Sequence, residues 1–463
     1  MPLRFCDWDS CTRPAFQGPG DCIGCDRHLC QTHLRCKLHD CPRLDGDLAA
    51  YDVQWAAAEG RKIPQLMKRI NKAALCARAS SLRGGIDCNA DLSRNALAGM
   101  MGGQNCHAII TFSDGVEWMA RFRIDAVKSP PPEVQVYVLR SEVATMEFLA
   151  SRTKIPVPRV YDWSCAKDAD GVDGVGVGYI LMEKIDGKPF DWNAATEAQK
   201  QKVMEQLVDI FIELERHPFD KLGSLMPVSE GSNPDIQGLS TSRLYRPNSG
   251  GTFGPFFSSR EEAEKTVNYC LDMVASGEMG IHNPVDEYLM RLYRLEVLDR
   301  LLDGRETDEK FYLKHPDEKG DHILVNSDFD IVGIIDWEWA RTVSYRDAFS
   351  APCMMWPVGE FYEGKNEVSK DEECFARLLE NRGRPGMANC VLEGRHLQRF
   401  WFNLLPQPYG SSWEDTVTLF QGLRSAFGDE TTWNDWKQDA LVKHGADKRL
   451  TKLIAQRDMS SRP

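Results

Sequence analysis

Apolar residues along the chain follow first strand spacing and then helical spacing, which predicts a small sheet followed by a long helical region. Two runs rich in β-branched and aromatic residues, 106–112 and 117–124, flank a Ser-Asp-Gly turn and predict a hairpin. Apolar positions recur at helical spacing from 133 to 150, and residues 179–183 again have strand character. This order predicts a small mixed sheet with one helix packed on it.

The rest of the chain is mainly helical, with one further hairpin. Helical patterns cover 197–215, 259–275 and 285–302. Two short apolar runs near 323 and 331 then predict buried strands joined by a Ser-Asp turn, and Asp336 stands at the end of the second strand. Aromatic residues near the C-terminus indicate helices that complete this larger region.

Length and composition are those of a globular protein with more than one core. The 463 residues are 42% hydrophobic and 27% charged. The net charge of −13 argues against a protein that coats nucleic acid or an anionic membrane by bulk charge. No apolar run reaches the length of a membrane span, and the first 30 residues lack the apolar core of a signal peptide. We expect a protein of the cytoplasm, with the nucleus left open, and neither a membrane anchor nor a nucleic-acid partner.

The first 41 residues carry seven of the 15 cysteines, with three histidines among them. Eight of these side chains follow the spacing Cys-x4-Cys-x10-Cys-x2-Cys-x4-Cys-x2-His-x5-His-x-Cys, which supplies ligands for two closed tetrahedral zinc sites. A segment this short cannot build an apolar core, so metal would supply folding free energy on the order of 10 kcal/mol per site. The alternative, a disulfide knot, is disfavoured by the missing secretory signal.

This cluster resembles the AN-one-type zinc finger. Residues 25–41 match the second half of that pattern letter for letter, whereas the opening pair is spaced more widely than the usual Cys-x2-Cys. The resemblance implies two structural zinc ions with interleaved ligands and a module for targeting or recognition that can bind a protein partner. The implied ligands are Cys6, Cys11, Cys30 and His33 for one ion, and Cys22, Cys25, His39 and Cys41 for the other.

Candidate catalytic residues concentrate between 311 and 338. His315, Asp317 and His322 lie in a loop that leads into the second hairpin, and Asp336 ends that hairpin. Polar side chains at the ends of rigid strands are well placed for catalysis. Each of Asp317, Asp321 and Asp336 alone is better explained as the cap of a turn, but the set indicates a functional site.

This stretch resembles the aminoglycoside phosphotransferase and choline kinase group of kinase-like enzymes, in the form common in fungal genomes. His315-Pro316-Asp317 matches the start of the family loop His-x-Asp-x4-Asn, and residues 335–338 match its Ile-Asp-Trp-Glu hairpin end. The resemblance covers about 102–347. It implies an α+β, bilobal protein-kinase-like fold, with a small sheet-plus-helix lobe and a larger helical lobe behind the finger.

The expected domain organisation follows from these patterns. It is a zinc finger at 1–45, a linker with N-terminal helices at 46–100, an N-lobe at 101–186, and a C-lobe at 187–463 that carries the catalytic loop 315–322 and the metal-binding hairpin 323–338.

The resemblance also implies residue roles. Asp317 would orient the acceptor hydroxyl and accept its proton, and Asp336 would bind the magnesium ion, since hard oxygen ligands suit Mg²⁺. Arg121 would be the cation on the central strand and Glu142 its partner on the helix, with Arg123 as the alternative to Arg121. An arginine there still offers a fork to phosphate groups.

Nucleotide contacts are expected from backbone in two places. Gly102 and Gly103 can form a tight turn whose amides approach a phosphate. Met182 and Glu183 fall where the linker between the lobes contacts the nucleotide base in the family.

His322 stands where the family has asparagine, and imidazole prefers borderline metals to Mg²⁺. Three outcomes are open: His322 binds Mn²⁺ or a weaker second ion, Asp321 takes the role of the asparagine, or the second metal is lost. We therefore expect a kinase that uses Mg²⁺ or Mn²⁺ with ATP or GTP to phosphorylate a hydroxyl of a small acceptor. The alternative is a catalytically degenerate adaptor that binds a protein through its finger.

Overall fold

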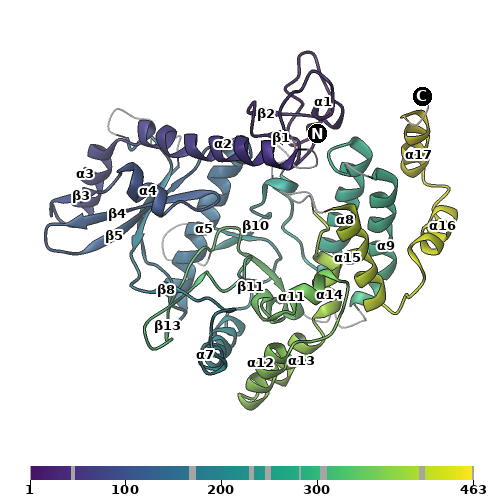
Figure 1. Cartoon of the computed structure of the whole chain (residues 1–463). Coiled ribbons are helices and arrows are strands. Elements are labelled where there is room, and N and C mark those ends of the chain that lie inside the picture. The colour runs from purple at the N-terminus through teal and green to yellow at the C-terminus, as the bar shows by residue number, and fades with distance from the viewer. Residues whose placement is uncertain are drawn as a thin grey trace.

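A five-stranded antiparallel sheet forms the N-terminal lobe (Figure 1). The structure, a computed structural model, describes residues 2–42, 47–165, 174–228, 234–245, 252–280, 283–302, 310–405 and 412–460. In spatial order the strands are β3 (Cys88–Ala90), β4 (Asn105–Phe112), β5 (Glu117–Arg123), β7 (Tyr179–Glu183) and β6 (Val160–Ser164). The predicted hairpin at 106–124 is therefore the centre of this sheet.

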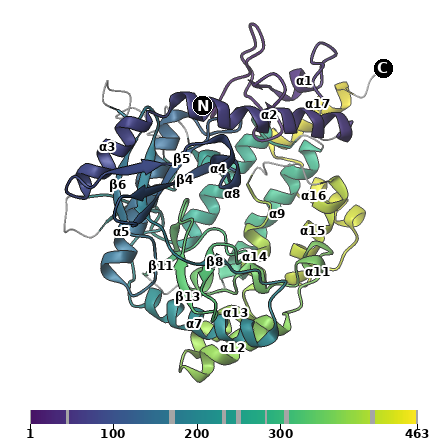
Figure 2. The same ribbon diagram turned by 60° about the vertical axis from the view of Figure 1, so that its left-hand side comes forward.

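Helices cover both faces of the sheet, and the two-residue period of the strands decides which side chain faces which helix (Figure 2). Trp118, Ala120 and Phe122 of β5 pack with apolar residues of α2 (Leu48–Arg69) and α3 (Lys72–Leu82). Residues between them, such as Arg121, face α5 (Pro132–Arg152), which is the predicted helix that carries Glu142.

The segment 46–100, for which the sequence predicts a linker with N-terminal helices, contains helices that pack on the sheet of the N-terminal lobe. Its helices α2 and α3 bury Ile63, Leu66 and Leu75 against the sheet, and β3 pairs with β4. Helix α4 (Arg94–Gly99) lies between β3 and β4. These elements belong to the core of the N-terminal lobe because the second face of its sheet would otherwise be exposed. The predicted boundary at 45 and 46 lies outside the described residues.

The C-terminal lobe is mainly helical, as predicted. Its helices are α7 (Glu197–Glu215), η1 (Ser242–Leu244), α8 (Ser259–Ser276), α9 (Pro284–Leu302), α10 (Tyr345–Ala348), η2 (Cys353–Met355), α11 (Val358–Tyr362), α12 (Lys370–Asn381), α13 (Pro385–Leu392), α14 (Arg395–Trp401), α15 (Trp413–Ala426), α16 (Trp433–Lys443) and α17 (Lys448–Ser460). One apolar core contains residues of α5 together with residues of the C-terminal lobe, so it joins the two lobes. A second core lies between α8, α9 and the C-terminal helices. The bilobal α+β fold class is confirmed.

Three small sheets lie within this lobe. Their strands are β8 (Lys188–Pro189) with β12 (Ile323–Val325) and β13 (Ile331–Ile334), β9 (Ser224–Met226) with β10 (Asp235–Gln237), and β11 (Phe311–Lys314) with β14 (Arg341–Ser344). The predicted hairpin is β12–β13, and the predicted catalytic loop connects β11 to β12. Among the described helices, none combines the length and the apolar character needed to cross a bilayer.

The N-terminal module is small and packs against both lobes. It consists of β1 (Asp21–Cys22), β2 (Arg27–His28) and α1 (Gln31–Leu34) around a core of cysteines and leucines. Arg4 donates to the backbone carbonyls of Val127 and Ser129 in the N-terminal lobe, at 3.1 and 2.5 Å. The backbone amide of Gln17 donates to the carbonyl of Glu278, after α8, at 2.9 Å.

Candidate active site and metal clusters

The predicted catalytic loop is fastened to the residue before Asp336. Nε2 of His315 donates to the carbonyl oxygen of Ile335 at 2.9 Å, and the amide of Ile335 donates to the carbonyl oxygen of His322 at 2.9 Å. The buried Trp337 ring packs edge-on against His315, with 4.9 Å between the ring centres. The fold therefore brings the loop 315–322 and the end of the hairpin together.

Asp317 lies at the surface of this junction. Its backbone amide donates to Nδ1 of His315 at 3.2 Å, and its carboxylate forms an ion pair with Lys319 at 2.9 Å. About 44% of the Asp317 side chain is exposed, so an acceptor molecule can reach it.

Asp336 has the backbone and the electrostatic surroundings of a functional residue. Its φ of 64° lies in the left-handed region, which is strained for a residue other than glycine and is common at active sites. Desolvation raises the pKa of its carboxyl, and the charges of Glu338, Asp317 and Asp321 raise it further, while Arg121 opposes them. A site that gathers this many carboxylates is suited to a cation.

The two histidines of the loop are neutral and have defined tautomers. Their rings stack at 4.3 Å, and burial lowers the pKa of His315 to about 4 and that of His322 to about 2. Nδ1 of each ring accepts a backbone amide, from Asp317 for His315 and from Gly320 for His322 at 3.3 Å. The proton of His322 is thus on Nε2, so in this arrangement the ring offers no lone pair to a metal.

In the small lobe Arg121 and Glu142 form a buried, bidentate ion pair. Only 7% of Arg121 and 1% of Glu142 is exposed. Burial by itself would lower the pKa of Arg121, but the carboxylates of Glu142 and Glu338 more than offset this and raise it. Arg121 is therefore a fixed positive charge, and the predicted pair of strand cation and helix carboxylate is present.

Glu338 is a functional candidate to which the sequence assigns no role. It forms an ion pair with Arg123, lies 3.8 Å from Arg121, and accepts a hydrogen bond of 2.9 Å from the side chain of Asn105. Arg123 is thus not a substitute for Arg121 but a second cation with its own partner. In the sequence, the feature that could have pointed to Glu338 is its place as the last residue of the Ile-Asp-Trp-Glu run.

The two backbone segments predicted to contact nucleotide lie at the edges of this arrangement. The amide of Gly102 donates to the carbonyl of Asn105 at 2.8 Å, which places the turn formed by Gly102 and Gly103 between β3 and β4, next to the Glu338 network. Met182 is 9% exposed at the end of β7. The amide of Glu183 already donates to the carbonyl of Arg159 at 2.8 Å.

A second charged group lies behind the catalytic loop. Lys314 contacts the carboxylate of Asp347 at 2.9 Å, the hydroxyl of Ser350 at 3.0 Å and the carboxyl of Glu318 at 3.9 Å. Burial raises the pKa of Glu318 to about 7, against the opposing charge of Lys314. The members come from separate segments, so the sequence gives no sign that they meet.

The cysteines and histidines of the N-terminal module form two groups of four. Within each group the candidate ligand atoms lie no more than 4.8 Å from one another. The groups are Cys6, Cys11, Cys30 and His33, and Cys22, Cys25, His39 and Cys41. Burial and the neighbouring thiols raise the pKa of Cys25 to about 12, so a cation would be needed to hold that sulfur as a thiolate. The donor set and the grouping both fit zinc.

Comparison with known proteins relates this site to a family. Residues 112–342, which include Arg121, Glu142, Asp317 and Asp336, match the phosphotransferase enzyme family.

Curated relatives align over shorter stretches. A subtelomeric hrmA-associated cluster protein of Aspergillus fumigatus is 34% identical over 26% of this chain and 21% of its own length. Altered inheritance of mitochondria protein 9, mitochondrial, of Zygosaccharomyces rouxii is 32% identical over 22% of this chain and 19% of its own length. The matched part thus spans about a fifth of these relatives.

Solved structures with a similar arrangement include kinases. A protein named as a fructosamine-3-kinase from Thermobifida fusca has a TM-score of 0.45 and 16% identity, and covers 76% of this chain and 98% of its own. The ethanolamine kinase of Plasmodium vivax has a TM-score of 0.40 and 11% identity, and covers 71% of this chain and 80% of its own.

Proposed function

We propose that this chain, which carries a phosphotransferase-family domain over residues 112–342, transfers the γ-phosphoryl group of ATP or GTP to a hydroxyl of a small molecule. The observation that carries the proposal is the junction at Ile335, where hydrogen bonds fasten the loop with Asp317 to the strand end with Asp336. Phosphoryl transfer requires mainly positioning and charge neutralisation; this junction supports the positioning, and a cation held by Asp336, together with Arg121, would supply the neutralisation.

Each charged residue has a separate task in this reaction. The exposed carboxylate of Asp317 orients the acceptor hydroxyl and receives its proton. Asp336 binds Mg²⁺ or Mn²⁺, which when bound neutralises charge on the phosphate oxygens. Arg121, held by Glu142, directs its fixed positive charge toward the phosphates.

The second metal site depends on Asp321 more than on His322. His322 donates through Nε2 because its Nδ1 accepts the amide of Gly320, so it can hold a hydrogen-bond acceptor but not a cation. Asp321 is exposed, and it lies close enough to Asp336 for its charge to raise the pKa of that carboxyl. Of the three alternatives, the tautomer favours Asp321 as ligand or the loss of the second ion.

We also propose that the N-terminal module binds two zinc ions and serves in recognition. Its contacts through Arg4 and Gln17 hold it against the N-terminal and C-terminal lobes, so a protein bound to the module would have a fixed orientation relative to the proposed active site. This role rests on the ligand grouping and on those contacts.

The test is phosphate transfer by the purified full chain, with γ-labelled ATP or GTP, Mg²⁺ or Mn²⁺, and a panel of hydroxylated metabolites. Asp317→Asn is expected to reduce the transfer rate by about 10²–10⁴-fold while it leaves nucleotide affinity unchanged. Asp336→Asn is expected to weaken metal-dependent nucleotide binding by about tenfold or more. Asp328→Asn, in the exposed turn of the same hairpin, is the matched control and should change neither.

The second candidate function is the catalytically degenerate adaptor, and it is favoured by the replacement of asparagine by a histidine whose ring, in this tautomer, offers no lone pair to a metal. The two candidates differ in a melting experiment, because a ligand that binds only the folded state raises the melting temperature. An unchanged melting temperature with ATP and GTP, each with Mg²⁺ and Mn²⁺, would support the adaptor and refute the kinase.

A further inference from the structure

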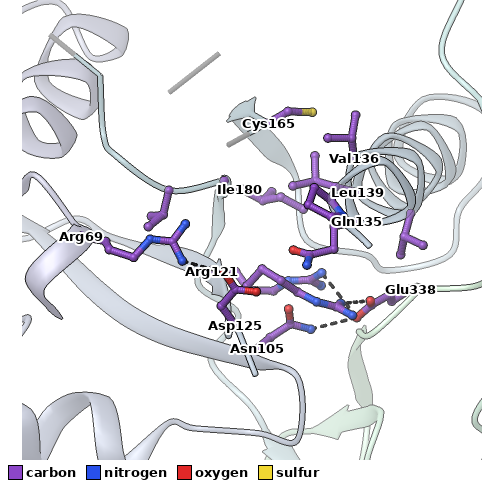
Figure 3. Close-up of a pocket in the computed structure, with 15 residues that line it drawn as sticks. Arg69, Asn105, Arg121, Asp125, Gln135, Val136, Leu139, Cys165, Ile180 and Glu338 are labelled. Atoms are coloured by element: carbon purple, nitrogen blue, oxygen red, sulfur yellow. Dashed lines mark hydrogen bonds and ion pairs between the residues drawn. The ribbon is translucent and has the colours of Figure 1, made fainter. Parts of the chain in front are cut away.

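A cavity of about 730 Å³, counting its open mouth, lies between the first turns of α5 and the sheet of the N-terminal lobe (Figure 3). Its lining includes Pro132, Gln135 and Leu139 of α5, Arg121 of β5 and Ile180 of β7. Side chains beside an empty space lack part of the packing that fixes a helix on a sheet. The position of these turns therefore depends strongly on how the start of the helix is held.

The connection from β5 to α5, residues 124–131, leads into the helix through three consecutive prolines at 130–132. Because each proline ring fixes the backbone angle φ, this stretch passes a displacement on to the helix. The ion pair of Asp125 in this connection with Arg69 of α2 is about half exposed, so it contributes little (Figure 3). Glu142 lies about three turns further along the same helix, so a shift of the connection reaches this carboxylate.

Arg4 of the N-terminal module holds the connection from outside. Its guanidinium donates to the backbone carbonyls of Val127 and Ser129, at 3.1 and 2.5 Å, and Ser129 stands directly before the prolines. Burial lowers the pKa of Arg4, and carboxylates that include that of Glu133, in the first turn of α5, oppose this effect. Arg4 is thus close to both the connection and the beginning of the helix.

The two groups of candidate zinc ligands determine where Arg4 lies within the module. Nη1 of Arg4 is 3.0 Å from Nδ1 of His28 and 3.9 Å from the carboxylate of Asp21. Each of these three residues stands within two positions of a cysteine in those groups. The module has only a small core of cysteines and leucines, so bound metal would be needed to keep this arrangement.

We propose that Arg4 is a positioning residue for α5, and that zinc bound by the module thereby controls the alignment of Glu142 with Arg121. In the loaded module Arg4 holds the connection, and α5 keeps Glu142 on Arg121. After loss of zinc the first turns of α5 are free to shift toward the cavity, and the pair is disturbed. This inference rests on the proposed function, in which Arg121 is directed at nucleotide phosphates and the module binds zinc.

The test is hydrogen–deuterium exchange of the full chain, measured at the backbone amides of residues 134–139 in α5. Arg4→Gln is expected to raise their exchange rates at least about tenfold and to leave those of α12 unchanged. Arg27→Gln is the matched control, because it makes the same change at an exposed arginine of the module, which lies over the ring of Trp8. Arg4→Lys keeps the charge and should give an intermediate rate. Unchanged exchange in Arg4→Gln, or equal exchange in Arg4→Gln and Arg27→Gln, would overturn the proposal.

Zinc removal distinguishes positioning through Arg4 from a general effect of the module. Treatment of the wild type with the chelator TPEN should raise the same exchange rates and weaken Mg²⁺–ATP binding, measured by calorimetry, at least about threefold. In Arg4→Gln the treatment should add little to either value, because the contact that transmits the effect is already lost. An equal further effect of TPEN on Arg4→Gln and on the wild type would refute the role of Arg4.

Exchange requires neither nucleotide nor turnover, so this inference and the proposed function fail separately. Faster exchange in Arg4→Gln, in a chain that binds neither ATP nor GTP, would refute the kinase and support the positioning of α5. Faster exchange in Arg4→Gln without any response of the wild type to TPEN would overturn the control by zinc.

Discussion

The buried pair of Arg121 and Glu142 should respond differently to the loss of one partner and the loss of both. Arg121 donates two hydrogen bonds to Glu142, and both side chains are almost fully buried. Glu142→Gln leaves Arg121 with one carboxylate, Glu338, at 3.8 Å. An uncompensated buried charge typically costs about 3–5 kcal/mol, and Glu338 should keep this variant near the lower value.

The double variant Arg121→Met with Glu142→Leu removes both charges and replaces them with apolar side chains of similar size. Such replacements are often neutral, so we expect the free energy of unfolding to stay within about 1–2 kcal/mol of the wild type. Glu338 remains paired in the double variant, because Arg123 and Asn105 still contact it. On the proposed function, in which Arg121 is directed at the phosphates, nucleotide affinity should fall at least about tenfold in both cases.

Urea unfolding followed by tryptophan fluorescence gives the stability, and titration calorimetry with Mg²⁺ and ATP gives the affinity. Arg382→Met, which breaks an exposed ion pair with Asp209, is the control and should cost no more than about 1 kcal/mol. A double variant as unstable as Glu142→Gln would refute the argument about uncompensated charge. A double variant with wild-type nucleotide affinity would refute the role of Arg121.

Three further predictions concern the loop and the N-terminal module. The pKa of Glu318 is raised by burial from 4.5 to about 7, so its ionisation destabilises the fold as pH rises through that interval. Glu318→Gln should therefore raise the free energy of unfolding at pH 8 by up to about 3 kcal/mol and leave it unchanged at pH 4.5, which urea unfolding at the two values checks. Metal analysis should find two zinc ions in the wild type and in Cys36→Ser, but one in Cys22→Ser; equal zinc content in the two variants would contradict the ligand grouping. Gln17→Ala removes a side-chain hydrogen bond of 3.3 Å to Glu278, and limited proteolysis should release the N-terminal module faster while the global unfolding midpoint stays the same.

Local pattern was enough to predict the elements that carry the site. Period-two alternation in 117–124 placed Arg121 and Arg123 on one face of a strand, and helical spacing placed Glu142 in the helix that covers it. Spacing alone could not choose between the two arginines. The structure uses both, because Glu142 and Glu338 reach the strand from different directions.

Tertiary packing decided what the sequence pattern could not. The pattern from 48 to about 76 indicates one or two helices, but nothing in its spacing tells which surface they cover, so their packing on the second face of the sheet could not be predicted. The contacts of Lys314 with Asp347 and Ser350 join positions more than 30 residues apart, and the buried position of Glu318 depends on them. Such groups are visible only after the chain has folded.

The Ile-Asp-Trp-Glu run connects the lobes because its successive side chains serve different parts of the molecule. The Asp336 carboxylate lies within range of the charges of Arg121 and of Asp317 and Asp321 in the loop, Trp337 is buried in the core of the large lobe against His315, and Glu338 reaches into the small lobe to Arg121 and Arg123. Neither helix nor strand geometry sends three consecutive side chains to three such places, and the left-handed backbone of Asp336 provides the necessary turn. The strain at this residue is therefore the structural cost of placing the carboxylate that we propose as a metal ligand and a lobe-bridging carboxylate two positions apart. It follows that relaxing this backbone would separate the cation of the small lobe from the carboxylates of the large one, even if every charged side chain were kept.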